Sequence, residues 1–261
     1  MTDNPAVLIT GASSGIGAVY ADRFAARGHD LVLVGRHAER LEQVAARIRF
    51  THGVGVEAIV SDLADPPDLE RIADRISSDA RIGILINNAG IAMPGNIADQ
   101  SPVDVERLIA VNVMAVARLA QAAAHRFAQQ RSGSIVSISS VVGLMPEFGQ
   151  AIYAASKSFV TTLSLAMAAD LHDRGVHVQA VLPAGTATHL WERSGADLAS
   201  LPQLMDVDVL VDAAMAGFDM RETITIPVLP DAALWDSYDA ARKAMLVHFG
   251  GVDAAARYLK G

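Results

Sequence analysis

Tyr153 and Lys157 are four residues apart in the segment YAASK, and the hydroxyl groups of Ser139 and Ser140 precede them at the end of an apolar run. Positions i and i+4 share one face of a helix, so we expect the phenol and the ammonium group to project together. A nearby positive charge favours phenolate and lowers the pKa of a tyrosine. Such a tyrosine can give a proton to a carbonyl oxygen or take one from an alcohol.

An isolated Tyr–Lys pair is more often a solvent-exposed pair on a surface helix, so the rest of the chain must decide. Gly11, Gly15 and Gly17 lie in TGASSGIG (10–17), between an apolar run and a helical segment. Backbone N–H groups at a helix N-terminus attract phosphate, and glycines let a pyrophosphate approach closely. Three glycines with this spacing are also compatible with an ordinary turn. Their position after the first predicted strand favours nucleotide binding.

Arg36 indicates which nucleotide. NAD sites place an acidic side chain near the end of the second strand to bind the ribose 2′-hydroxyl. Here that strand ends at Gly35 and Arg36, and the first acid is Glu39. A guanidinium group binds phosphate through a forked pair of donors, so the sequence favours NADP(H) over NAD(H). A solvated arginine on the loop is the alternative.

The elements that would position these residues alternate regularly. Short β-branched runs predict strands at 6–10, 30–35, 54–60, 82–86, 133–139 and 176–182. Helical periodicity predicts helices at 15–28, 37–50, 66–78, 102–130 and 152–175. Continuous apolar strands, each followed by a helix, are typical of a parallel sheet covered on both faces. Right-handed crossovers then give an α/β, doubly wound, Rossmann-type fold, which we expect to form a single domain over 1–261.

The regular alternation of strand and helix patterns ends after residue 185. Residues 186–205 lack periodicity and are predicted to form a substrate lid. A helix at 206–219, a final strand at 223–229 and a C-terminal helix at 231–250 are expected to follow.

Composition limits the function classes. The 261 residues are 51% hydrophobic, carry a net charge of −8 and show no run of Lys or Arg, which argues against nucleic acid or an anionic membrane as a partner. The absence of cysteine excludes disulfides and thiolate catalysis, and the eight dispersed histidines predict no metal site. The N-terminus lacks the features of a signal peptide, and the longest apolar stretch, 110–124, is interrupted by polar residues. We therefore expect a cytoplasmic protein.

Several motifs in order resemble the classical short-chain dehydrogenases/reductases, over residues 5–188. Besides the glycine turn they include Asp62 and Leu63 after the third strand, NNAG (87–90) after the fourth, and Asn112 on the long helix. The separation of 13 residues between Ser140 and Tyr153 is also common in that family. The resemblance implies a catalytic tetrad, which would comprise Asn112, Ser140, Tyr153 and Lys157.

The resemblance also implies roles. Lys157 would hold the nicotinamide ribose, Ser140 would bind the substrate oxygen, and Asn112 would keep a water in the proton relay. The expected cofactor contacts are Gly11, Ser13, Ser14, Gly15, Ile16, Gly17, Arg36, Asp62, Leu63, Asn88, Ala89, Gly90, Tyr153, Lys157, Pro183, Gly185, Thr186 and Thr188. Two positions depart from the family pattern: Ala184 follows Pro183 where many members have glycine, and Gly83 stands where many have aspartate.

The substrate is less well specified. Besides Ser140, the residues expected to surround it are Met93, Met145, Phe148, Leu190 and Trp191, which suggest an apolar or bulky carbonyl compound, although ordinary core packing explains such residues equally well. The leading hypothesis is an NADP(H)-dependent oxidoreductase that interconverts a ketone or aldehyde and its alcohol. A non-catalytic NADP(H) sensor on the same fold is the alternative. We also expect a homodimer or homotetramer, because members of the family often pair through the long helices.

Overall fold

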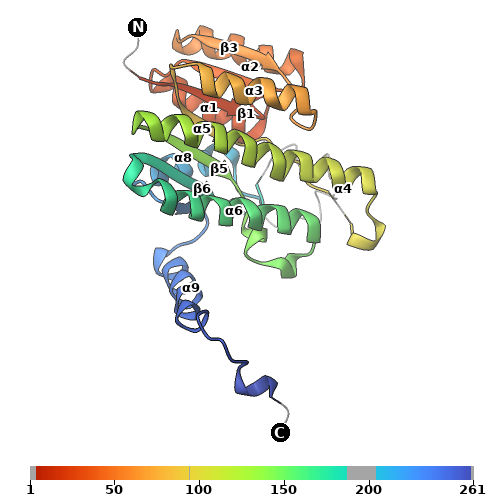
Figure 1. Cartoon of the computed structure of the whole chain (residues 1–261). Helices are drawn as coiled ribbons and strands as arrows, with labels where there is room; N and C mark the ends of the chain where they lie inside the picture. The colour runs from red at the N-terminus through yellow and green to blue at the C-terminus, as the bar shows by residue number, and fades with distance from the viewer. Residues whose placement is uncertain (1–3, 94, 187–203, 260–261) are drawn as a thin grey trace. The chain divides into compact units, whose positions relative to one another are not determined.

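The computed structural model describes residues 4–93, 95–186 and 204–259 (Figure 1). The chain divides into two compact units, Met1–Pro227 and Val228–Gly261. The first unit contains the seven-stranded sheet, the glycine turn and all four residues of the predicted catalytic tetrad.

A seven-stranded parallel sheet forms the centre of the first unit, with the order β3-β2-β1-β4-β5-β6-β7. Its strands are β1 (Ala6–Thr10), β2 (Leu31–Gly35), β3 (Val56–Val60), β4 (Ile82–Asn87), β5 (Gly133–Ile138), β6 (Val176–Val181) and β7 (Ile224–Thr225). Every residue of β1, β2 and β6 is buried, as the continuous apolar runs of β1 and β2 predict.

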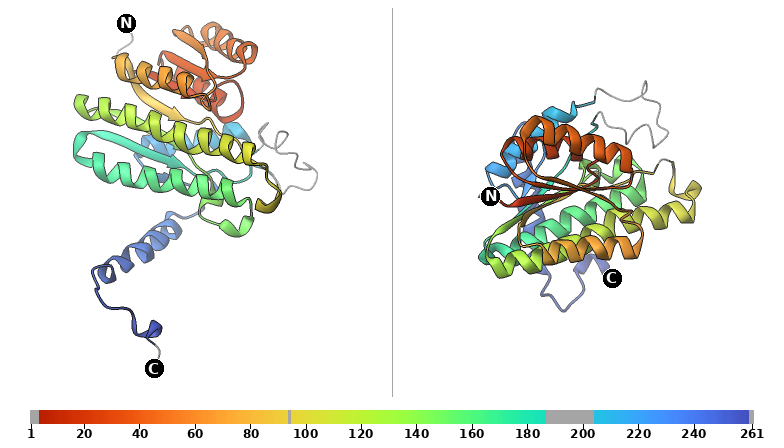
Figure 2. Two further views of the ribbon diagram at one scale, coloured as in Figure 1. Left: turned by 45° about the vertical axis from the view of Figure 1, so that its right-hand side comes forward. Right: turned by 90° about the horizontal axis from the view of Figure 1, so that it is seen from above.

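Helices cover both faces of this sheet (Figure 2). One layer comprises α3 (Pro66–Ser78), α5 (Val116–Gln130) and α6 (Ala151–Leu171), and the other comprises α1 (Gly15–Ala26), α2 (Ala38–His52) and α8 (Val207–Asp219). Successive side chains of β1 enter opposite cores: Leu8 packs in the first layer, whereas Val7 and Ile9 pack in the second. The predicted doubly wound α/β fold is confirmed.

The strand order places the site. β1 lies between β2 and β4, so the chain leaves the carboxyl ends of β1 and β4 toward opposite faces of the sheet. A crevice opens at such a switch point, and ligands of doubly wound folds bind there. The glycine turn follows β1, and the NNAG segment follows β4.

Three predicted elements differ from the structure. The helix expected over 102–130 is α4 (Pro102–Ile109) and α5, joined by a π-helical turn at Ala110–Ala115. The strand expected at 223–229 is limited to the two residues of β7, because Pro227 has no N–H to donate to a ladder. The last predicted helix ends early: α9 (Ala232–Ala244) is followed by a 3₁₀ turn, Met245–His248.

Within the described residues, one helical segment, Pro102–Gln130, is by length and composition alone apolar enough to cross a membrane. Half of its most apolar window is buried inside the protein, where α5 packs on the sheet and on α3. A core helix of a globular domain has the same properties, and this burial explains its composition.

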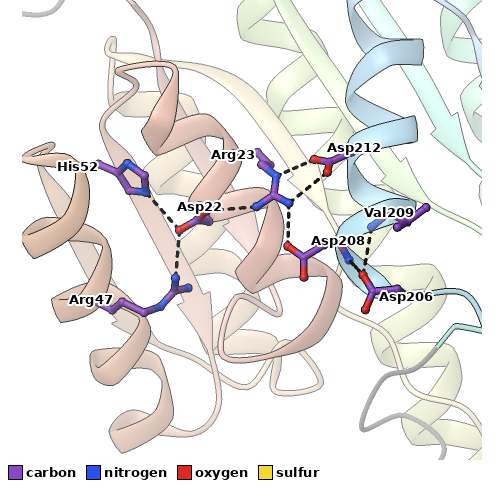
Figure 3. A network of polar contacts seen from close by, with 8 residues as sticks. All are labelled: Asp22, Arg23, Arg47, His52, Asp206, Asp208, Val209 and Asp212. Atoms are coloured by element: carbon purple, nitrogen blue, oxygen red, sulfur yellow. Dashed lines mark hydrogen bonds and ion pairs between the residues drawn. The ribbon is translucent and has the colours of Figure 1, made fainter.

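An ion-pair network joins α1 to the two other helices of its layer (Figure 3). Arg23 on α1 donates hydrogen bonds to Asp212 at 2.6 Å and to Asp208 at 2.7 Å, both on α8. Asp22 accepts a bond of 3.0 Å from Arg47 on α2. Exposed pairs of this kind stabilise a fold by less than about 1 kcal/mol each. Their main effect is to fix the direction of α1, and the glycine turn lies at its N-terminus.

The second unit contains α9 and two 3₁₀ turns, Met245–His248 and Ala256–Tyr258. Asp231 caps α9 by accepting a hydrogen bond from the N–H of Ala233 at 2.8 Å. Asp239 pairs with Arg242 and Lys243 one helical turn later. None of the residues in α9 is buried.

Candidate active site

The glycine turn is bonded directly to the NNAG segment. The side-chain amide of Asn88 donates to the carbonyl oxygens of Thr10, at 2.9 Å, and Gly11, at 3.2 Å. In return, the Thr10 hydroxyl oxygen accepts bonds of 3.0 Å from the N–H groups of Asn88 and Ala89. Gly11 adopts a φ of 65°, which is unfavourable for residues with a Cβ atom. The loops after β1 and β4 therefore form one rigid wall.

This wall presents free backbone donors. Ser14, the N-cap of α1, makes no side-chain capping bond, so the first N–H groups of the helix have no such partner within the described chain. Gly15 has a φ of 55°, and the turn exposes these donors to the cavity between β1 and β4. The helix dipole adds positive potential at the same place. The arrangement suits a phosphate group.

Gly17 explains how close the two loops come. A Cβ atom built on it would lie 2.5 Å from the carbonyl oxygen of Gly11 and 2.5 Å from the side-chain nitrogen of Asn88. No side chain could occupy that space without moving the backbone. Gly17 therefore contributes to the site through packing, and it does not line the cavity.

Arg36 and Asp62 mark the far end of the same cavity. Arg36 follows β2, is exposed, and has no hydrogen bond to another described residue. Asp62 accepts a bond of 2.7 Å from Arg107 on α4 and another from the N–H of Ala64. Partial burial raises the pKa of Asp62, but the bonds from Arg107 and Ala64 and the charge of Arg36 have the larger effect. The pKa is therefore below its usual value, and this carboxyl stays ionised.

Ser140 is placed by a close approach between two elements. It is the N-cap of a 3₁₀ turn, Val141–Gly143, which lies directly on α6: a Cβ on Gly143 would come within 2.8 Å of the backbone of Lys157. The Ser140 hydroxyl donates to the carbonyl of Pro183 at 3.2 Å. Glycine at 143 thus brings the serine against the helix that carries Tyr153.

Tyr153 and Lys157 project from α6 as their spacing predicts. The ammonium nitrogen of Lys157 lies 5.6 Å from the centre of the Tyr153 ring and donates a 2.8 Å bond to the carbonyl of Ile138. Burial lowers the pKa of Lys157 to about 8. Burial also raises the pKa of Tyr153 to about 12, against a smaller lowering by a hydrogen bond with Ser140.

This pKa of Tyr153 differs from the expectation that Lys157 would lower it. The reason is desolvation: removing a phenol from water disfavours its charged form. Tyr153 is therefore protonated at neutral pH in this structure, which is the form that a proton donor requires.

Asn112 lies in the π-helical turn between α4 and α5. Its side-chain amide pairs with the peptide of Ile91 in both directions, each at 2.9 Å, and donates to the Ser156 hydroxyl at 3.2 Å. Ser156 in turn donates to the carbonyl of Tyr153 at 2.7 Å. π-Helical turns are frequent at functional sites. Here the turn brings Asn112 behind the helix of Tyr153 and Lys157.

These residues surround one cavity of about 250 Å³. It gathers Ser140 and most of the predicted cofactor contacts, namely Gly11, Ser13, Ser14, Gly15, Ile16, Arg36, Asp62, Leu63, Asn88, Ala89, Gly90, Tyr153, Lys157, Pro183, Gly185 and Thr186. Asn112 stands just behind it, next to Gly90. Positions that are far apart in the sequence thus meet at one edge of the sheet.

The predicted substrate residues are dispersed. Met93 is buried, whereas Met145 and Phe148 are 51% and 67% exposed, and none of the three lines the cavity. Thr188, Leu190 and Trp191 lie outside the described residues, as does most of the lid predicted at 186–205. The N–H of Met205, at the end of the predicted lid, donates a 2.9 Å bond to the carbonyl of Gly185, which directly precedes the lid.

The sequence reasoning missed Gln150, which lines the cavity three positions before Tyr153. Helical spacing could not have found it, because Gln150 precedes α6 as its N-cap and adopts a left-handed backbone conformation. It also missed Val141 and Val142, which line the wall next to Ser140.

Comparison with known proteins identifies the family. A profile of the short chain dehydrogenase family matches residues 5–199. The chain belongs to the short-chain dehydrogenase/reductase family. Its relatives include a very-long-chain 3-oxoacyl-CoA reductase of Anas platyrhynchos, 34% identical over 190 residues, which are 70% of this chain and 60% of that protein. The chain thus spans only 60% of the length of that relative.

Two solved structures match almost the whole chain. A short-chain dehydrogenase from Sphingobium yanoikuyae in complex with NADPH is 54% identical, with a TM-score of 0.96, and the match covers 98% of this chain and 100% of that one. A bulky-bulky ketone specific alcohol dehydrogenase from Comamonas testosteroni is 47% identical, with a TM-score of 0.93 and coverage of 99% and 100%.

One departure from the family pattern has a local explanation. A Cβ on Gly83 would lie 2.6 Å from the Cβ of Pro5, so the chain entering β1 fills the space above β4 that a side chain would need. At the other departure, Ala184 lines the cavity and accepts a 2.9 Å bond from the Thr186 hydroxyl.

Proposed function

We propose that this protein is an NADP(H)-dependent oxidoreductase that interconverts a ketone or aldehyde and its alcohol. The observation that carries the proposal is the single cavity that joins an anion-binding glycine turn and Arg36 to the Ser140–Tyr153–Lys157 group. When bound, the cofactor supplies or accepts the hydride. The 54% identical structure in complex with NADPH supports the choice of nucleotide.

The chain's own residues bind and orient the reactants. The glycine turn and the N-terminus of α1 hold the phosphates, and Arg36 binds the 2′-phosphate through its forked donors. Asp62 and Leu63 line the adenine end, and the lining from Asn88 to Gly90 with Pro183, Gly185 and Thr186 encloses the nicotinamide end. Lys157 binds the ribose through its ammonium group.

Tyr153 transfers the proton. Its hydroxyl is protonated at neutral pH, so in reduction it gives its proton to the carbonyl oxygen, and in oxidation it takes the proton back. The Ser140 hydroxyl binds the same oxygen and stabilises its developing charge. Asn112 holds the Ile91 peptide and, through Ser156, the first turn of α6, so that the proton path behind Lys157 keeps its geometry.

The substrate is an apolar or bulky carbonyl compound. Ile91, Ala92, Val141 and Val142 give the cavity an apolar wall around the catalytic hydroxyls. The relative from Comamonas testosteroni is described as specific for bulky-bulky ketones, which agrees with this class. Met93, Met145, Phe148, Leu190 and Trp191 stay candidates for contacts that form when substrate is bound.

The second candidate is a non-catalytic NADP(H) sensor. A sensor needs the glycine turn and Arg36, but it has no use for a buried Tyr153 beside Lys157, so the tetrad favours the enzyme. The discriminating experiment incubates the purified protein with NADPH and a panel of ketones and aldehydes and follows NADPH absorbance. Consumption of any carbonyl compound supports the enzyme, whereas tight NADPH binding without consumption across the panel supports the sensor.

We also propose a cytoplasmic homodimer or homotetramer that pairs through α4–α5 and α6. Met114 is 58% exposed and Val103 70% exposed on the first of these faces, and Phe159 is 36% exposed on the second. Burying such side chains against a second copy would remove apolar surface from water. Light scattering at micromolar concentration tests this proposal, and a monomeric mass would contradict it.

A further inference from the structure

Gln150 adopts a backbone conformation that is costly for its residue type. Its φ and ψ are 56° and 53°, in the left-handed region that residues with a Cβ atom avoid. Glycine or asparagine is the usual choice for this conformation. Residues held there against their preference persist only where the surrounding structure fixes them, and they cluster at functional sites.

The capping role of this position does not explain the choice. Gln150 is the N-cap of α6, where Ser, Thr, Asp and Asn are preferred because a short side chain reaches the first free N–H groups. The Gln150 side chain makes no such bond. Its carbonyl oxygen alone contributes, by accepting a 2.8 Å bond from the N–H of Ala154.

Gln150 lies at the active site instead. It lines the cavity together with Ser140, Tyr153 and Lys157. Within the described parts of the chain its amide forms no hydrogen bond, so a donor and an acceptor of this cavity-lining residue are available to a ligand. The neighbouring wall, with Val141 and Val142, is apolar, so Gln150 is a polar point beside the group that transfers the proton.

We propose that Gln150 is a specificity-determining residue, whose amide hydrogen-bonds a second oxygen that the substrate carries one or two bonds from the reacting carbonyl. This inference rests on the proposed function and adds a substrate class to it: bulky ketones with a neighbouring hydroxyl or carbonyl group. An amide can donate to either group and can also accept from a hydroxyl. A site built to bind an oxygen substituent discriminates against the analogue that lacks it, because the buried polar group is then left unpaired.

The test compares two matched ketones, benzoin and deoxybenzoin, which differ only by the hydroxyl group next to the carbonyl. Three variants are used: Gln150→Met, which keeps length but removes both hydrogen-bonding groups, Gln150→Asn, which keeps an amide, and Gln150→Gly. The measured quantity is the ratio of kcat/KM for the two ketones, because the intrinsic reactivity of each ketone cancels when variant and wild type are compared.

We expect Gln150→Met to lower the benzoin:deoxybenzoin ratio at least tenfold, while kcat/KM for deoxybenzoin and the Kd for NADPH change less than threefold. Gln150→Asn should recover part of the ratio. Gln150→Gly should lose the ratio as Met does, yet keep or raise the Tm, because glycine adopts the left-handed conformation without strain. A merely structural role for Gln150 would instead lower the Tm and reduce activity on both ketones equally.

A benzoin:deoxybenzoin ratio that is unchanged or higher in Gln150→Met overturns the inference. If wild type consumes neither of the two ketones but reduces other carbonyl compounds, the inference fails and the proposed function stands. If it reduces no carbonyl compound of the panel, the proposed function itself fails.

Discussion

A Cβ atom on Gly17 would lie 2.5 Å from the carbonyl oxygen of Gly11, so the first turn of α1 rests directly on the loop that follows β1. We expect Gly17→Ala to weaken NADPH binding at least tenfold and to lower the Tm, because the methyl group must displace backbone at the phosphate site. The better helix propensity of alanine, worth up to about 1 kcal/mol, is too small to offset that clash.

Fluorescence titration of NADPH and thermal melting measure both effects of Gly17→Ala. Gly250→Ala is the control, because a Cβ at position 250 meets no atom within 4 Å. Normal NADPH affinity in Gly17→Ala would show that the two loops are not held as closely as described.

Arg36 is the residue that we propose selects NADP(H) over NAD(H). We expect NADPH to bind at least tenfold more tightly than NADH, a difference of about 1.4 kcal/mol, which is modest for a charge-assisted pair. Arg36→Ala should remove most of this preference by weakening NADPH alone. Arg118→Ala is the matched control, since that guanidinium pairs with Glu70 and does not line the cavity. Equal Kd values for the two cofactors in wild type would contradict the assignment.

The pKa of Lys157 predicts how NADPH binding depends on pH. Burial lowers this pKa to about 8, so the ammonium group is charged below pH 8 and neutral above it. An anionic cofactor favours the charged form, so the Kd for NADPH should be constant from pH 6 to about 8. It should then rise by up to tenfold per pH unit, as binding must first restore the proton.

The control for this pH titration is Lys157→Met, which should bind more weakly at pH 7 and show no inflection near pH 8. A wild-type Kd that stays flat to pH 10 would mean that Lys157 does not contact the cofactor as a charged group.

The sequence predicts most of the fold because its signals are local. Most strands of the sheet are short runs rich in apolar and β-branched residues, and each helix before residue 175 has a clear period, so the order of elements follows directly. The elements that were predicted wrongly depend on tertiary packing and on the position of a strand in the sheet. Nothing in 102–130 marks the π-helical turn, which is set by packing around Asn112, and the length of β7 depends on its being an edge strand that Pro227 ends.

The site residues also fall into those that the sequence could predict and those that it could not. Tyr153, Lys157 and the glycine turn could be found because their spacing is fixed within one helix or one turn. Gln150 could not, because its left-handed backbone and its unpaired amide appear only once α6 is placed beside the cavity. The raised pKa of Tyr153 could not be predicted for a related reason. The sequence shows the charge of Lys157, but it does not show the burial that outweighs this charge.

The most direct test of the catalytic role is Tyr153→Phe. This substitution keeps the ring and its packing beside Lys157 but removes the hydroxyl that we propose transfers the proton. With one active carbonyl substrate, turnover should fall by roughly two to four orders of magnitude, the usual contribution of a positioned general acid. The Kd for NADPH should change little, whereas Lys157→Met should impair both turnover and binding. If Tyr153→Phe retains more than a tenth of wild-type turnover with the chemical step limiting, Tyr153 is not the proton donor and the proposed mechanism is wrong.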